Sequence, residues 1–234
     1  FQTVPLLQRI VRPLNSMSPV KVPASGKYTV MRVSPENVPT QPKLVLLFNS
    51  DLEPDAKSFT FINAAKQRVD LLVLPEVLTY GGGSTYEQCA EPIPGPSTEF
   101  FGKLAKQHKL HLVPGLIERD RHLIYNVAVL IGPDGKLLGK YRKVCLPRGE
   151  IEGGFQPGND YPVFDTKLGK VGMMVCYDGF FPEVARELSN RGAEVIAFPV
   201  MGCNPLLAAA RACENHVYVV SSTHTDAKQD WMVS

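Results

Sequence analysis

Reactive polar residues stand where three apolar segments end. Glu76 follows "DLLVLP", a basic group stands in "KLLGKYRKV" (Lys140, Arg142 and either Lys143 or Lys136), and Cys176 closes "KVGMMVC". A carboxylate, an ammonium group and a thiol are the groups that supply a general base, a fixed positive charge and a nucleophile. Each also has a more ordinary interpretation by itself: a loop glutamate, a solvated basic strand, or a small buried cysteine.

Cys176 has the sequence context of a turn from a strand into a helix. Gly179 and Pro182 follow it closely and frame a tight turn before a helical pattern. A thiol at such a turn faces the cleft, feels the positive end of the helix, and is favoured as thiolate. Backbone N–H groups after it can meet a developing oxyanion. No histidine lies near in sequence, so the base would be a carboxylate.

Glu76 is a candidate for the missing base, and a lysine of the basic segment is a candidate for the missing charge. A glutamate flanked by apolar residues is costly to bury unpaired, and an environment of that kind suits general acid–base work near neutral pH. A lysine that points into the same site would supply a positive charge and an oxyanion donor.

Apolar strand patterns alternate with amphipathic helix patterns from residue 43 onward, which favours a layered α/β fold with ligands at strand ends. The expected strands are 43–48, 70–75, 110–118, 124–132, 136–144, 170–176, 194–199 and 217–222. The expected helices are 57–68, 96–108, 181–191 and 205–215.

Local chemistry fixes several of these boundaries. Pro96, Pro182 and Pro205 stand at or near the first helical position, where a proline costs no hydrogen bond. Gly192 follows "ARELSNR" as a helix stop. The segment "GPDGK" (132–136) predicts a hairpin turn between two strands.

Composition excludes several classes of partner. The 234 residues include 25 basic and 23 acidic side chains, a net charge of +2, which gives no electrostatic case for binding nucleic acid or a membrane surface. No apolar run approaches the roughly 18 residues of a membrane span. The five cysteines form no C-x-x-C pair and the histidines show no metal-binding spacing, so we expect no metal, no cofactor and no disulfide framework.

The chain divides into two unequal parts. Residues 1–42 hold seven prolines and little periodicity, and we interpret them as an extension or the remnant of a preceding module, with "KYTVMRV" as one strand. Residues 43–234 form the main domain, which stops at "DWMVS" as another strand begins, and we expect it to be truncated there. A cytoplasmic location is favoured, and export is the alternative because the chain opens on Phe1 and a leader can have been removed.

Several blocks, in order, resemble a known family. "LLVLPE", "YRKVCLP" and "VGMMVCYDGFFPEVAR" look like the signature segments of the carbon–nitrogen hydrolase (nitrilase) superfamily, and "RGAEVIAFP" and "ARACENHVYVVSS" agree with it. The resemblance covers about residues 43–234. It implies a four-layer αββα sandwich and a homodimer or higher homo-oligomer.

The resemblance also implies a Glu–Lys–Cys triad: Glu76 as general base, Lys143 as the positive charge and Cys176 as nucleophile. The backbone N–H of Tyr177 would complete the oxyanion hole.

A second glutamate is expected to position the lysine. Glu152 fits best, because "IEGGFQPG" resembles aliphatic amidases, and Glu150 is the alternative.

The implied reaction is hydrolysis of an amide or N-carbamoyl C–N bond through a cysteine thioester, with a small-molecule substrate. "CYDGFFPE" looks more like amidases and carbamoylases than nitrilases proper. A nitrilase that acts on nitriles and a non-catalytic binding or scaffold member are the alternatives.

Loops after the strands would set the substrate. Tyr80, Phe180 and Asn204 are candidate lining residues, although each is equally consistent with surface packing. An N-carbamoyl amino acid would need an arginine near its carboxylate. Arg148 and Arg211 are available, but for either one alone the expected state is solvated.

Overall fold

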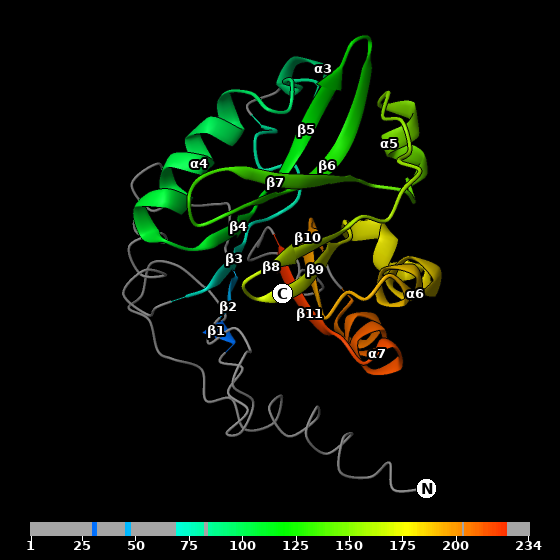
Figure 1. Ribbon diagram of the computed structural model, residues 1–234. Helices are drawn as coiled ribbons and strands as arrows, with labels where there is room; N and C mark the ends of the chain where they lie inside the picture. Colours follow the sequence, from blue (N-terminus) through cyan, green and yellow to red (C-terminus); the bar gives the residue numbers. More distant parts are fainter. Residues whose placement is uncertain (1–29, 32–44, 48–68, 82–83, 203, 224–234) are drawn as a thin grey trace, which may run out of the picture.

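The computed structural model describes residues 30–31, 45–47, 69–81, 84–202 and 204–223, and these form two stacked β-sheets with helices outside them (Figure 1). The first sheet has seven strands in the order β1-β2-β3-β4-β6-β5, and β7 pairs with β6. Its strands are β1 (Val30–Met31), β2 (Val45–Leu47), β3 (Leu71–Val73), β4 (His111–Val113), β5 (Gly115–Asp120), β6 (Leu123–Ile131) and β7 (Leu137–Arg142).

The second sheet has four strands in the order β11-β10-β9-β8. Its strands are β8 (Val163–Thr166), β9 (Gly169–Met173), β10 (Val195–Val200) and β11 (Tyr218–Thr223). The helices are α3 (Tyr86–Cys89), α4 (Pro96–His108), α5 (Arg148–Glu152), the 3₁₀ helix η1 (Cys176–Phe180), α6 (Pro182–Asn190) and α7 (Pro205–Asn215).

Alternation along the strands produces the layers. In β3, Leu71 and Val73 face the second sheet and pack with residues of β9 and β10. Leu72 instead faces α4 and packs with Phe101 and Ala105. A third apolar cluster joins the outer face of the second sheet to α6. Figure 1 shows α4 on one side of the stacked sheets and α6 and α7 on the other, so the expected four-layer αββα sandwich is confirmed.

Most expected elements are confirmed with small changes at their ends. Helices α4 and α7 have the predicted bounds, and Pro96, Pro182 and Pro205 each stand at the start of a helix. Gly192, just after α6, has a φ of +91°, which glycine adopts without a steric penalty. The predicted turn at 132–136 joins β6 to β7.

Other expectations need correction. The single strand predicted over 110–118 is two strands, β4 and β5, with Pro114 between them, because proline has no N–H to donate to a strand ladder. Strand β8 and helices α3 and α5 were not predicted from the sequence. The predicted helix 57–68 lies outside the described residues.

The predicted domain boundary at residue 42 falls inside the first sheet. Strand β1 belongs to the segment interpreted as an extension, yet it pairs antiparallel with β2. The remainder of residues 1–42 lies outside the described residues, so the interpretation of that segment stays a prediction. In the part of the chain that the structure describes, no helix has the length and hydropathy to cross a membrane.

Candidate active site

The three polar residues singled out from the sequence meet at strand ends of both sheets. Glu76 lies in the turn after β3, Lys143 directly follows β7, and Cys176 opens η1 just after β9. Lys143 Nζ lies 2.8 Å from Glu76 Oε1, and the side chains are 0% and 3% exposed. A lysine and a glutamate this deeply buried are stable only as a pair.

A close backbone approach fixes the place of Glu76. A Cβ atom at Gly115 would lie 2.6 Å from the Glu76 Cα, so only glycine fits at the start of β5. The Glu76 N–H also donates to the Val200 carbonyl at 3.4 Å, which ties the turn to the second sheet. The carboxylate therefore enters the site from a backbone held on two sides.

Asn126 on β6 completes a network around the lysine. Its Nδ2 donates to Glu76 Oε1 at 2.8 Å and to Glu150 Oε2 at 3.2 Å. Lys143 Nζ donates to Glu150 Oε1 at 2.5 Å. Two carboxylates thus share one ammonium and one amide. Asn126 was not among the candidates from the sequence, although an asparagine inside the apolar run "IYNVAVLIG" was a signal, since a buried amide needs partners.

The structure places Glu150, and not the preferred Glu152, beside Lys143. Glu152 is 61% exposed and pairs with the exposed Arg148 at 2.7 Å, whereas Glu150, the alternative, contacts Lys143. Residues 150 and 152 lie two positions apart in α5. They therefore point about 200° apart around the helix axis, and only one can face the site.

Cys176 adopts a strained backbone conformation at a sharp turn. Its φ is +41°, while Val175 before it is extended and the 3₁₀ helix begins at Cys176 itself. Positive φ is unfavourable for a residue with a side chain and marks sites where the surroundings impose it. Tyr177 stands second in η1, where the first N–H groups have no acceptor inside the helix. The turn has the expected nucleophile-elbow form.

The expectation of a thiolate at Cys176 was wrong. Burial and then the charge of Glu76 raise the pKa of the thiol far above its ordinary value, and the opposing effect of Lys143 is smaller. The five-residue η1 provides only a short dipole, and α6 begins several residues later at Pro182. The thiol is therefore protonated at neutral pH and needs a base. Glu76, whose charge contributes to the raised pKa of the thiol, is the neighbouring carboxylate that can act as this base.

Lys143 stays charged despite its burial. Burial alone lowers its pKa, but the charges of Glu76 and Glu150 raise it above the ordinary value. Burial raises the pKa of Glu150, and Glu76 adds to that rise while Lys143 opposes it.

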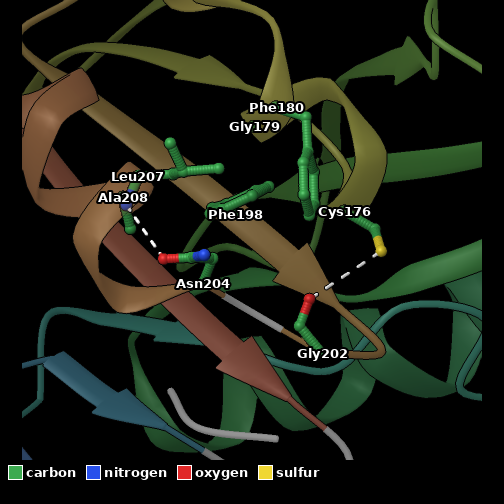
Figure 2. A pocket seen from close by; sticks show the side chains of 8 residues that line it. All are labelled: Cys176, Gly179, Phe180, Phe198, Gly202, Asn204, Leu207 and Ala208. Atoms are coloured by element: carbon green, nitrogen blue, oxygen red, sulfur yellow. Dashed lines mark hydrogen bonds between the residues drawn. The ribbon is translucent and has the colours of Figure 1, made fainter. Parts of the chain in front are cut away.

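A small, open hollow lies beside Cys176 (Figure 2). Its wall is mostly apolar, with two glycines and one amide, and is formed by Cys176, Gly179, Phe180, Phe198, Gly202, Asn204, Leu207 and Ala208. The Cys176 Sγ lies 4.0 Å from the Gly202 carbonyl oxygen.

Two of the three candidate lining residues line the hollow. Phe180 and Asn204 line the hollow, and the Asn204 side-chain oxygen caps α7. Tyr80 does not line it, and its ring instead packs on that of Tyr86 at 4.5 Å. Burial raises the pKa of Tyr86, and Tyr80 and Glu150 contribute further. Tyr80 therefore belongs to an aromatic pair on the carboxylate side of the site.

Arg211 is not solvated, contrary to expectation. It is 6% exposed, and its guanidinium donates to the carbonyls of Gly179 at 3.2 Å and Phe180 at 3.4 Å. Its role in this structure is to fasten η1 to α7. Arg148 is exposed, as expected, with Glu152 as its partner.

Comparison with known proteins identifies the family. The carbon–nitrogen hydrolase family model matches residues 29–233. A nitrilase from Pyrococcus abyssi is 42% identical over 73% of this chain and 70% of its own length. The omega-amidase NIT2-A of Xenopus laevis is 37% identical over 68% of this chain. The chain spans only 64% of that relative's length.

A solved structure agrees with these sequence matches. An amidase from Nesterenkonia sp. AN1 superimposes with a TM-score of 0.63 at 25% identity, covering 73% of this chain and 68% of that one. The chain belongs to the carbon–nitrogen hydrolase family.

Proposed function

We propose that this protein hydrolyses the C–N bond of a small amide or N-carbamoyl compound through a thioester on Cys176. The observation that carries the proposal is the buried Lys143–Glu76 pair at 2.8 Å beside Cys176, whose thiol pKa is raised by burial and by Glu76. A thiol of this kind becomes nucleophilic only when a neighbouring base removes its proton during attack.

The first half of the reaction forms the thioester. Glu76 takes the Cys176 proton as the sulfur attacks the carbonyl carbon. Lys143 Nζ and the Tyr177 N–H donate hydrogen bonds to the negative oxygen of the tetrahedral intermediate. One such donor lowers the barrier by about 3–4 kcal/mol. The protonated Glu76 then gives its proton to the leaving nitrogen, the C–N bond breaks, and ammonia or an amine departs.

The second half releases the acid. Glu76, again a carboxylate, takes a proton from water as the water oxygen attacks the thioester carbon. The C–S bond breaks, the proton returns to the sulfur, and the carboxylic acid leaves. One water is consumed in each cycle and the enzyme returns to its starting protonation state.

Relatives support this chemistry. The structure of the E41Q mutant of the Nesterenkonia amidase is described as showing covalent addition of the acetamide moiety of fluoroacetamide at the active-site cysteine, which supports a nucleophilic cysteine in that relative. Relatives of this chain are named nitrilase and omega-amidase. The mostly apolar lining of the hollow beside Cys176 favours an aliphatic acyl group.

The decisive experiment measures ammonia release from a panel of aliphatic amides, N-carbamoyl compounds and nitriles. Cys176→Ala should abolish turnover with the fold intact, as judged by circular dichroism. Cys213→Ala is the matched control, because Cys213 is a free cysteine on α7 that does not line the hollow. Full activity in Cys176→Ala would sink the assignment.

The two alternatives are outcomes of the same panel. Turnover confined to nitriles identifies a nitrilase proper. An absence of turnover on every compound, by the protein with all its residues intact, favours a binding or scaffold member.

A further inference from the structure

Asp178 is a buried carboxylate that the proposed reaction does not use. It lies in η1, two residues after Cys176, and is 0% exposed. Its Oδ2 accepts hydrogen bonds from the Val175 N–H and the Tyr141 hydroxyl, both at 2.8 Å. Its Oδ1 accepts from the Cys145 N–H, also at 2.8 Å.

The donors to Asp178 flank two of the proposed catalytic residues. Val175 is the residue immediately before Cys176 and lies two residues past β9 of the second sheet. Tyr141 and Cys145 lie two residues before and two residues after Lys143, Tyr141 within β7 of the first sheet and Cys145 just past its end. One carboxylate therefore joins the backbone around the nucleophile to the backbone around the lysine, across the interface between the sheets.

We propose that Asp178 is a positioning residue that holds the Cys176 turn in register with Lys143. This proposal rests on the proposed function, since it concerns the geometry of the same triad. The strained φ of +41° at Cys176 is a conformation that surrounding contacts must impose, and the bond from Val175 restrains the residue directly before it.

The ionised carboxylate is the side chain that fits this place. All three partners are donors, and asparagine would turn an NH₂ group toward at least one of them. Burial raises the pKa of Asp178 to about 6, and the hydrogen bonds from Cys145, Val175 and Tyr141 counteract that rise.

The test compares Asp178→Asn with Tyr141→Phe, which removes a single hydrogen bond to Asp178. Asp165→Asn is the control, because Asp165 is 87% exposed on β8. For each variant, kcat and KM are measured on the best amide of the panel. The rates of Cys176 and Cys213 alkylation by iodoacetamide are measured by peptide mass spectrometry.

A positioning role predicts that Asp178→Asn lowers kcat by about tenfold or more, with KM changed by less than about threefold. Alkylation of Cys176 slows by roughly fivefold, because the thiol is displaced from Glu76 and Lys143, while Cys213 keeps its rate. A purely structural role predicts the opposite sign for alkylation, since loosening of the fold exposes the thiols and speeds modification at both positions.

Unchanged or faster alkylation of Cys176 in Asp178→Asn would overturn the proposal. If that variant does not fold, Tyr141→Phe decides. An intermediate loss of kcat and of Cys176 alkylation supports the proposal, and wild-type values for both refute it. If the unaltered protein turns over nothing, the proposed function fails, yet the alkylation ratio still tests the positioning role by itself.

Discussion

Replacing Glu150 by glutamine tests which glutamate serves the site, and Glu152→Gln is its matched control two residues away. The Glu150 carboxylate is 14% exposed and accepts from Lys143 Nζ at 2.5 Å and from Asn126 Nδ2 at 3.2 Å. Glutamine keeps the shape, removes the charge and turns a donor toward Lys143 or Asn126. The lysine then loses one of its two carboxylate partners.

The size of the effect follows from the contacts. A hydrogen bond to a charged group contributes about 1.5–3 kcal/mol, and about 1.4 kcal/mol is a tenfold change in rate. Glu150→Gln should therefore lower kcat/KM by roughly 10- to 100-fold. Glu152 forms a surface pair with Arg148, whose side chain is 90% exposed. Such pairs contribute about 0–1 kcal/mol to stability and have no contact with the site, so Glu152→Gln should leave kcat/KM within about twofold.

The assay is initial-rate ammonia release on the best substrate of the panel, with thermal unfolding of both variants to exclude loss of fold. The two variants share chemistry, helix and neighbourhood, so their difference isolates the contact with Lys143. A tenfold loss in Glu152→Gln with Glu150→Gln near wild type would refute the reasoning and restore the preference drawn from the sequence.

Two further predictions concern the remaining charges. Lys143→Met should lower the free energy of unfolding by about 3–5 kcal/mol, because it leaves buried carboxylates without their cation. Urea denaturation measures this free energy, and a loss below about 1 kcal/mol would contradict the buried pairing. The raised pKa of the Cys176 thiol predicts that no thiolate is present at neutral pH. The measurement is the ultraviolet thiolate absorbance of the protein minus that of Cys176→Ala, which should be zero at neutral pH and rise only above the pKa of about 8.5 of a free cysteine. A difference signal at neutral pH would show that the helix start outweighs burial and Glu76.

The parts of the fold that follow from local chemistry were predictable. Helices α4 and α7 match their predicted bounds because each begins at a proline and continues with an amphipathic pattern. Strand β8 was not predicted, since "VFDT" is short and only half-buried, and its periodicity is weak.

Only some of the site residues were predictable from the sequence. Glu76 and Cys176 were recognisable from the apolar residues before them in the sequence, but Asn126 and Asp178 are defined by partners far along the chain. Asn126 meets Glu76 across 50 positions, and Asp178 meets Tyr141 across 37. The choice between Glu150 and Glu152 depended on how a short helix is rotated, which a five-residue segment does not encode through periodicity.

The charges at the site explain why a protonated thiol suits the proposed reaction. Lys143 faces two carboxylates, so the ionised cluster carries one excess negative charge, and a thiolate would add a second beside the buried Glu76. Transfer of the Cys176 proton to Glu76 avoids that cost, because one negative charge leaves the carboxylate as another develops on the sulfur and then on the substrate oxygen. The total charge stays constant while Lys143, fixed by Glu150, remains in place to stabilise the oxyanion. Glu150 and Asn126 keep the lysine and the base in position during this proton transfer, when the Glu76 carboxylate becomes neutral and its pairing with Lys143 weakens.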